Sequence, residues 1–320
     1  MASARAAMLP PVDPSKPLDL VAIGSWTCFD HLLPVERLPA AGDTVRVTGP
    51  VTEVGKVSWG GCAQNNAAAA ARLGLTCALV SVVGRDFRDS GYAAYFQELG
   101  VVLDGTIVVE DGLCGHSFLF SDPTGTAICL SHLGVSERQE EFAPSADVVG
   151  AARVAIVNYR FDRFTLDAAR IAAAAGSTVV ISGNLATAPK VARSFLAAAH
   201  VLVCTAHEAC QLTRAIGGKR RDDLFALGLR AVVETEGRSG SVIFSANGDG
   251  VRIPAIPAEP VDPVGAGDAF AGGLASGVAM GLPIGEAARL GAAVASFVVE
   301  VTGCQTNLPS LEAAQRRLLR

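Results

Sequence analysis

Residues 262–268 read Asp-Pro-Val-Gly-Ala-Gly-Asp and combine the residue types best suited to chemistry in this chain. Gly265 and Gly267 flank Ala266, so a turn here can present backbone N–H groups without obstruction by side chains. We expect a helix to begin directly after this turn. Because the first N–H groups of a helix have no partner within it and the helix dipole is positive there, the segment predicts an anion-binding site.

Asp268 lies at the mouth of this predicted anion site. Its carboxylate could accept the proton of a hydroxyl group as that hydroxyl attacks a phosphoryl group. Phosphoryl transfer requires mainly positioning and stabilisation of charge, which an aspartate beside oriented N–H donors can supply. The alternative is an aspartate that only caps the helix after a glycine-rich turn. These seven residues, taken alone, do not decide between the two interpretations.

The segment resembles the C-terminal signature of the ribokinase/PfkB family of carbohydrate and nucleoside kinases, which continues with two small residues, here Gly272 and Gly273. A second stretch, residues 60–67 followed by Gly74 and Gly84, resembles the N-terminal signature of the same family. The two stretches stand far apart in the chain and in the order that the family shows. The resemblance extends from about residue 19 to the C-terminus.

This resemblance implies a PfkB-type kinase that transfers a phosphoryl group from ATP, with Mg²⁺, to an alcohol group. It implies that Asp268 is the general base and that the backbone of Gly265, Ala266 and Gly267 forms the anion hole. The resemblance also assigns the acceptor site to Gly60, Gly61, Asn65 and Asp30.

The chemistry of these acceptor residues agrees with the assignment. Glycines allow the backbone to approach a sugar closely, and the Asn65 amide offers a donor and an acceptor to a hydroxyl group. A glycine turn in which Asn65 caps the following helix would give the same pattern. Asp30 stands about one residue further from Gly24 than in ribokinase-like relatives.

A third stretch, Thr235-Glu-Gly237-Arg-Ser-Gly240, resembles the family segment that contacts the phosphates of the nucleotide. A strand end, a hydroxyl and glycines suit that role, although a plain turn is the alternative. Asn184 replaces the acidic pair that many relatives carry after the middle strand. We therefore predict an ATP site at Thr235, Gly237, Gly240 and Asn184.

Metal ligands are implied at two positions. Glu208 matches the family residue that helps to organise Mg²⁺ through water and phosphate, but Thr205 replaces the asparagine that usually precedes it. Asp262 belongs to a stretch that binds a monovalent cation such as K⁺ in many members. Cys204, His207 and Cys210 are spaced by three, yet a fourth ligand is missing nearby, so buried cysteines and a surface histidine are the better interpretation.

Composition limits the partners of the chain. It has 320 residues, of which 50% are hydrophobic and 18% charged, and its net charge is −5. This charge gives no footprint for nucleic acid, and no run of about 18 apolar residues predicts a membrane span. The eight cysteines form no disulfide framework, which favours reduced thiols in a cytoplasmic protein. Residues 1–17 carry four prolines and are predicted to be a disordered leader.

Hydrophobic patterning predicts an α/β fold, which the resemblance specifies as a ribokinase-like three-layer sandwich with a mostly parallel central sheet and a small β lid. Strands and helices alternate after residue 151, which is typical of a parallel sheet covered on both faces. Residues 18–320 would form the kinase domain, with lid segments at about 28–61 and 101–132. Strands are expected at 19–24, 77–83, 154–157, 179–182, 200–204, 231–235 and 241–244. Antiparallel strands are expected at 45–58, 105–109 and 117–130, the last broken by the Asp-Pro-Thr-Gly turn at 122–125. Helices are expected at 65–73, 90–99, 165–175, 188–199, 207–215, 221–229 and over most of 268–320, with breaks at Gly281, Gly303 and Pro309.

The predicted acceptor is a neutral sugar of the ribose or fructose type, because the lid carries only Arg37, Arg46 and Lys56. A nucleoside of the adenosine type is the alternative, since residues 84–87, 131–134 and 301–305 resemble nucleoside-kinase stretches. A non-catalytic binding or scaffold protein on the same fold is a further hypothesis. A nicotinamide dehydrogenase is disfavoured because no G-x-G-x-x-G follows the first strand. Lids in this family often pair between subunits, which suggests a homodimer.

Overall fold

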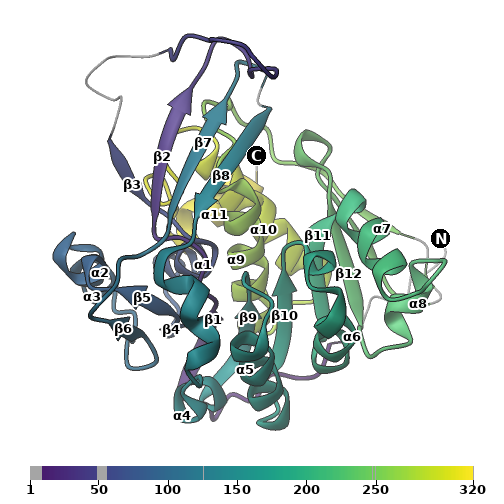
Figure 1. The fold of residues 1–320 in the computed structure, drawn as a ribbon. Coiled ribbons are helices and arrows are strands. Elements are labelled where there is room, and N and C mark those ends of the chain that lie inside the picture. Colours follow the sequence, from purple (N-terminus) through teal and green to yellow (C-terminus); the bar gives the residue numbers. More distant parts are fainter. Residues whose placement is uncertain (1–8, 49–55, 125, 247, 249, 320) are drawn as a thin grey trace.

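The computed structural model describes residues 9–48, 56–124, 126–246, 248 and 250–319. Its centre is an eight-stranded sheet in the order β14-β13-β12-β11-β10-β9-β1-β4 (Figure 1). The six strands from β12 to β4 are parallel, whereas β13 and β14 run antiparallel at one edge. The strands are β1 Leu18–Ile23, β4 Cys77–Val80, β9 Ala152–Val157, β10 Thr178–Ser182, β11 Val201–Thr205, β12 Ala231–Thr235, β13 Ser241–Phe244 and β14 Val251–Ile253.

Helices cover both faces of this sheet, because the parallel strands are apolar on both sides. Along β1, Leu20 and Ala22 belong to one hydrophobic core, and Val21 and Ile23 belong to the other. The predicted three-layer sandwich with a mostly parallel sheet is confirmed. One core contains α1 Cys62–Arg72, α3 Tyr92–Glu98, α9 Ala266–Ala279, α10 Ile284–Val298 and α11 Leu311–Leu318. The other contains α4 Ala146–Gly150, α5 Arg163–Ala174, α6 Pro189–Ala198, α7 Ala206–Ala215 and α8 Asp222–Phe225.

A second sheet projects from one end of the central sheet, at the top of Figure 1, in the order β3-β2-β7-β8. Its strands are β2 Phe29–Pro34, β3 Val57–Trp59, β7 His116–Ser121 and β8 Ala127–His132. We call it the lid sheet. β2 follows β1 after only a short loop, so the lid sheet stands at the carboxyl ends of the central parallel strands. One face of it carries Asp30, Ser117 and Ser131, which lie opposite one another on adjacent strands.

Two strand predictions differ from the structure. The alternating pattern at 45–58 forms a strand only at Val57–Trp59, with a bridge between Val35 and Val47, and residues 49–55 lie outside the described residues. The predicted antiparallel strand at 105–109 is instead β6 Ile107–Val109, which pairs in parallel with β5 Val82–Gly84. This segment follows a bridge between Ala78 and Val102, so it stays beside the central sheet and does not enter the lid sheet.

The predicted leader at 1–17 is partly packed against the body of the protein. Its first eight residues lie outside the described residues, but Leu9 and Val12 contact the hydrophobic core. The Lys16 ammonium donates to the Ala152 carbonyl oxygen at 3.0 Å.

The predicted helices are also present, with some shorter than expected. Helix 221–229 is only the single turn of α8. The helix predicted at 90–99 is α3, and a separate short helix, α2 Asp86–Asp89, precedes it. No helix among the described residues is long and apolar enough to cross a membrane.

Candidate active site

Gly265 caps the start of α9 in the left-handed conformation, with φ of 80°. A Cβ atom there would lie 2.7 Å from the Cys304 sulfur, so both the turn and the packing require glycine. The N–H groups of Gly265, Gly267 and Asp268 donate to no other described residue, whereas Ala266 donates to the Pro263 carbonyl oxygen. The turn therefore presents free backbone donors at the positive end of a fourteen-residue helix.

Asp268 lies in the first turn of α9 and is held from α1. The Asn65 amide nitrogen donates to Asp268 Oδ2 at 2.8 Å, and the Asn66 amide nitrogen donates to the main-chain oxygen of Asp268 at 2.7 Å. Burial raises the pKa of Asp268, while hydrogen bonds from Asn65 and Cys62 lower it. A Cβ atom at Gly272 would lie 3.2 Å from Asn66 Cα, so glycine at this position lets the two helices approach.

Gln305 fixes the Asn65 amide in this orientation. Its Nε2 donates to Asn65 Oδ1 at 2.8 Å and to the Tyr92 hydroxyl oxygen at 2.6 Å. The Tyr92 hydroxyl in turn donates to the Gly60 carbonyl oxygen at 2.9 Å. Because Asn65 Oδ1 is occupied, its Nδ2 is the atom that faces Asp268. Residues 301–305 resemble a nucleoside-kinase stretch, but their residue types alone assign no role to Gln305.

Asp30 lies on the inner face of the lid sheet, where only 5% of its surface is exposed. A Cβ atom at Gly60 would lie 1.9 Å from Asp30 Oδ2, so Gly60 makes room for this carboxylate. The pKa of Asp30 is raised to about 7. Burial is the main cause, the charges of Asp268 and Asp262 add to it, and a hydrogen bond from Cys304 opposes it.

Gly61 adopts φ of 96°, and a Cβ atom on it would lie 2.2 Å from the Thr27 carbonyl oxygen. Asp30, Gly60, Gly61, Asn65 and Asp268 are thus linked by direct contacts or by neighbouring positions in the chain. The structure brings the predicted acceptor residues together with the predicted base.

Two aromatic residues that the sequence did not single out lie beside this group. The Trp26 indole N–H donates to Ser131 Oγ at 3.1 Å, on the same face of the lid sheet as Asp30. The Tyr159 ring lies 5.5 Å from the Trp26 ring, and its hydroxyl oxygen accepts the Asn184 N–H at 2.6 Å. The two rings follow the carboxyl ends of β1 and β9, which are adjacent strands.

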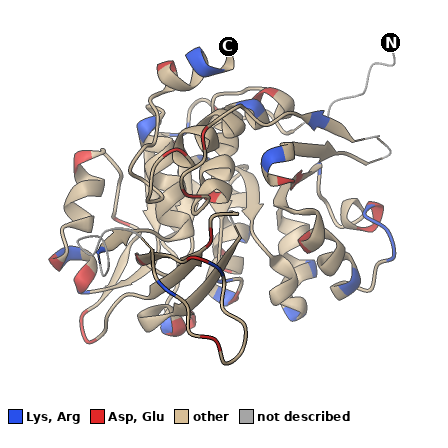
Figure 2. Cartoon of the chain, turned by 90° about the horizontal axis from the view of Figure 1, so that it is seen from above, with Lys and Arg blue, Asp and Glu red and all other residues tan. Residues whose placement is uncertain are grey.

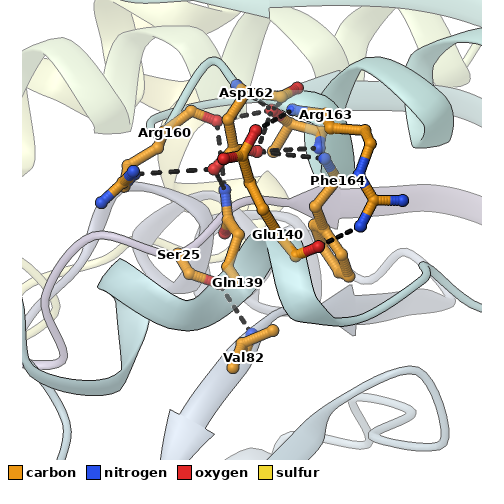
Figure 3. A network of polar contacts seen from close by, with 9 residues as sticks. Ser25, Val82, Gln139, Glu140, Arg160, Asp162, Arg163 and Phe164 are labelled. Carbon is orange, nitrogen blue, oxygen red and sulfur yellow. Dashed lines mark hydrogen bonds and ion pairs between the residues drawn. The ribbon is translucent and has the colours of Figure 1, made fainter.

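A polar network anchors the chain that follows Tyr159 (Figure 3). The Gln139 amide donates to Asp162 Oδ2 at 2.7 Å and to the Arg160 carbonyl oxygen at 3.4 Å. Asp162 also caps α5 by accepting the N–H groups of Phe164 and Thr165. This network fixes the loop between β9 and α5 and, with it, the position of Tyr159.

The predicted nucleotide residues lie at the carboxyl ends of β10 and β12. Thr235 ends β12, and its hydroxyl donates to the Cys204 carbonyl oxygen at 3.4 Å. Gly237 and Gly240 form the following turn, where a Cβ atom at Gly240 would lie 2.2 Å from the Ile253 carbonyl oxygen. Asn184 follows β10, and its amide donates to Gln211 Oε1 at 3.0 Å. Carboxyl ends of parallel strands are where α/β folds bind ligands.

The predicted metal residues have structural partners. Glu208 and Thr205 form a capping box at the start of α7, with Glu208 Oε2 accepting the Thr205 N–H at 2.7 Å. The Asp262 oxygens accept the N–H groups of Val264 at 3.0 Å and Gly303 at 3.4 Å, which ties two loops together. The described residues contain no group of three His, Cys, Asp or Glu side chains placed to hold a metal ion.

This arrangement defines a sugar or nucleoside kinase fold with free backbone N–H groups at the start of α9 and a carboxylate beside them. The family model of the pfkB family carbohydrate kinases matches residues 18–311, so the chain belongs to this family and is a kinase.

The chain is similar to other members over nearly its whole length. The nucleoside kinase of Methanothermobacter thermautotrophicus is 29% identical, over 95% of this chain and 96% of that protein. Ribokinase of Mus musculus is 28% identical, over 91% of each chain. The crystal structure of the Methanocaldococcus jannaschii nucleoside kinase has a TM-score of 0.82 and 26% identity, and covers 95% of this chain and 99% of that one.

Proposed function

We propose that this kinase transfers the γ-phosphoryl group of ATP to a hydroxyl group of a nucleoside, with Asp268 as the general base. The observation that carries the proposal is the Asp268 carboxylate at the free N–H groups of α9, held by Asn65 beside Asp30. Asp30 and Asn65 would orient the acceptor hydroxyl, and Asp268 would take its proton as it attacks. The backbone of Gly265, Gly267 and Asp268 would stabilise the charge on the transferred group.

The proposed ATP site comprises Thr235, Gly237, Gly240 and Asn184, at the same edge of the sheet. Mg²⁺ fits this edge because Glu208 uses Oε2 for the capping box and keeps Oε1 for a water of the ion. The metal would neutralise phosphate charge during transfer. Asp262 supports a monovalent cation such as K⁺ indirectly, since it joins the two loops that would surround the ion.

A neutral acceptor suits the charges near the lid sheet. Arg37 and Arg46 already pair with Asp43 and Glu36. Elsewhere, Lys and Arg are distributed over several elements, with Asp and Glu between them (Figure 2). Among the described residues around the lid sheet, no cluster of Lys and Arg is therefore left to bind a phosphate on the acceptor.

The aromatic pair favours a nucleoside over a free sugar. Trp26 and Tyr159 lie under the lid-sheet face that carries Asp30, and aromatic rings stack well on nucleobases. The relatives named nucleoside kinase agree with this choice. A free ribose- or fructose-like sugar is the second candidate, because Asp30, Gly60, Gly61 and Asn65 need only furanose hydroxyls.

The test is ADP production with ATP and Mg²⁺ over inosine, adenosine, cytidine, ribose, fructose and ketodeoxygluconate. We expect turnover that depends on a nucleoside, and Asp268→Asn should lower kcat by roughly 10²- to 10⁴-fold while ligands still bind. Trp26→Ala should raise KM for the nucleoside more than for ribose. Undiminished turnover by Asp268→Asn would rule out the base. Binding of acceptor without turnover by the wild type would favour the scaffold hypothesis.

We also propose a cytoplasmic homodimer that pairs through the outer face of the lid sheet. All eight cysteines are free thiols, which suits a reducing compartment. The lid-sheet face opposite Asp30 exposes the apolar residues Val57, Phe118, Ile128 and Leu130. An exposed apolar patch of this kind is typical of a protein–protein interface, so we propose that a second copy of the chain covers it.

A further inference from the structure

A cavity of about 470 Å³ lies between β3, α1, α3 and the segment after α10. Its walls share no residue with the proposed acceptor and nucleotide sites. The volume falls within the range of small-molecule sites in proteins. The lining residues are Val57, Ser58, Trp59, Arg72, Tyr95, Leu99, Gln305, Thr306 and Leu308.

The cavity carries one positive charge and no negative one. Arg72 Nε donates to the Leu308 carbonyl oxygen at 3.3 Å, and no carboxylate among the described residues pairs with its guanidinium. The terminal amino groups of Arg72 thus keep their donors for an anion, which a guanidinium binds well. Arg72 is exposed, so a ligand can reach its guanidinium from solvent.

Two aromatic side chains, Trp59 and Tyr95, form part of the walls. The rings of Trp59 and Tyr95 lie 4.8 Å apart, and Trp59 stacks on Tyr92 behind it at 5.1 Å. This stacking keeps the Trp59 indole in place, so it offers a fixed wall to a flat ligand. Thr306 and Tyr95 also carry hydroxyl groups. The positive charge of Arg72 and the flat aromatic walls together favour a small aromatic anion as the ligand of this cavity.

Gln305 connects this cavity to the catalytic centre. It lines the cavity, and both hydrogens of its amide nitrogen are used, one by Asn65 Oδ1 and one by the Tyr92 hydroxyl oxygen. Its Oε1 is buried and has no partner among the described residues. An anionic occupant would be a new acceptor for the same hydrogens. It would compete with Asn65 and so loosen the amide that holds Asp268.

We propose that the cavity beside Arg72, Trp59 and Tyr95 binds a small aromatic anion, which inhibits the kinase through Gln305 and Asn65. The binding part stands independently of the proposed reaction. The inhibition part rests on the proposed role of Asp268. The two parts are therefore measured separately.

Binding is tested by titration calorimetry with 2-naphthoate as the probe, in the presence of Mg²⁺ and the imido analogue of ATP, which fills the nucleotide site. We expect binding to the wild type, and roughly tenfold weaker binding to Arg72→Gln because a charge-assisted hydrogen bond is lost. The neutral 2-naphthamide and the non-aromatic cyclohexanecarboxylate should both bind more weakly than the probe. Arg85→Gln, an exposed arginine on the loop before α2, is the matched control and should bind as the wild type does.

Equal affinity in Arg72→Gln, or no binding to the wild type at millimolar concentration, would overturn the site. Thermal unfolding of Arg72→Gln checks that the variant is folded. If Arg72→Gln does not fold, Tyr95→Leu is used instead, because it removes an aromatic wall of the cavity. This variant should lose more affinity for 2-naphthoate than for cyclohexanecarboxylate.

Inhibition is tested with the acceptor that the ADP screen identifies. The probe should lower kcat of the wild type several-fold with little change in KM for the acceptor. In Gln305→Leu it should still bind, but kcat, already reduced, should no longer respond. A probe that binds without changing kcat would overturn the coupling, and a probe that raises KM alone would place it in the acceptor site. Failure of every acceptor would count against the proposed function and leave the calorimetry valid.

Discussion

Asp30 and Asp268 are the two carboxylates at the centre of the site, and burial raises the pKa of both. Their surroundings differ in one respect. Asp268 receives a hydrogen bond from an amide, which favours its ionised form, whereas the partner of Asp30 is the weaker donor Cys304. The amide hydrogen bond thus favours the ionised form of Asp268, which suits its proposed role as the general base.

The Asn65 hydrogen bond should therefore be visible in the pH dependence of catalysis. A base works only when ionised, so kcat should fall as the pH drops through the pKa of Asp268. Asn65→Ala removes an interaction that lowers this pKa, so the acid limb should move to higher pH in addition to any loss of rate. The measurement is kcat against pH for wild type and variant.

The matched control for this prediction is Asn307→Ala. Asn307 lies two residues after Gln305, and its amide donates to the Phe297 carbonyl oxygen, away from Asp268. Its acid limb should coincide with that of the wild type. An unchanged or downward-shifted limb in Asn65→Ala would contradict the assigned role.

Asp30 should make stability depend on pH. Its carboxyl has a pKa of about 7 when folded against an ordinary value of 3.8. Between these two values the folded state binds more protons than the unfolded state, so stability is full below about pH 4 and declines as the pH rises through 7. The ionised carboxylate would destabilise the empty enzyme by up to about 4 kcal/mol at pH 8.

Asp30→Asn should accordingly raise the melting temperature at pH 8, reduce its decline between pH 5 and 8, and weaken acceptor binding. Differential scanning calorimetry at several pH values measures the first two effects. Asp104→Asn, on an exposed turn, should leave the trend as in the wild type. A lower melting temperature of Asp30→Asn at pH 8 would show that the charge is compensated in the folded state.

At the scale of elements, the site depends on the close approach of α1 and α9. α1 brings Asn65 and Asn66, and α9 brings Asp268. Glycine also allows close packing of α9 on α10, since a Cβ atom at Gly273 would lie 2.9 Å from Gly291 Cα. The two small residues after Gly-Ala-Gly-Asp in the signature thus serve helix packing, which in turn sets the position of Asp268, the proposed base.

Gly272→Val tests this relation between packing and catalysis. The added side chain would begin 3.1 Å from Ala69 Cβ and 3.2 Å from Asn66 Cα, so the helices must separate. We expect a loss of about 1–3 kcal/mol in the free energy of unfolding and a reduced kcat. Denaturant titration and turnover measure the two effects.

Gly285→Ala is the control for this substitution, since it lies in the first turn of α10 with nothing within 4 Å of its added Cβ. It should retain stability and kcat. Wild-type stability in Gly272→Val would mean that α1 and α9 can adjust without cost.

At the scale of the whole molecule, the lid sheet separates an inner polar face from an outer apolar face. Asp30, Ser117 and Ser131 face the site, whereas Phe118 and Leu130 lie opposite each other on the other side. Leu130 is 58% exposed. The lid sheet can therefore cover a ligand and contact a second subunit at the same time.

If the outer face pairs two subunits, Leu130→Glu should convert a dimer to a monomer, because a charge would be buried without a partner. Sedimentation velocity measures the change in mass. Val251→Glu replaces an exposed apolar residue on the edge strand β14 and should not change the mass. A wild type that sediments as a monomer, or a Leu130→Glu variant that stays dimeric, would exclude this interface.

The sequence by itself determined the layered fold, the family and the residues of both signatures. Periodic apolar runs require burial on both sides, and Gly265, Gly60 and Gly61 occupy positions that no side chain fits. Burial of a strand and the backbone conformation of a glycine depend mainly on neighbouring residues in the chain, so the sequence pattern predicts them. The roles assigned to the nucleotide and metal residues follow from resemblance and stay predictions.

Only the tertiary structure placed four further residues beside the candidate active site: Gln305, Tyr92, Trp26 and Tyr159. Gln305 meets Asn65 from 240 residues away, and Trp26 meets Tyr159 only because β1 and β9 are neighbours in the sheet. The position of the strand at 107–109 is likewise set by its parallel pairing with β5, which its own alternation of polar and apolar residues did not predict. Such contacts depend on which elements lie side by side, and a pattern read along one chain carries no information about distant partners.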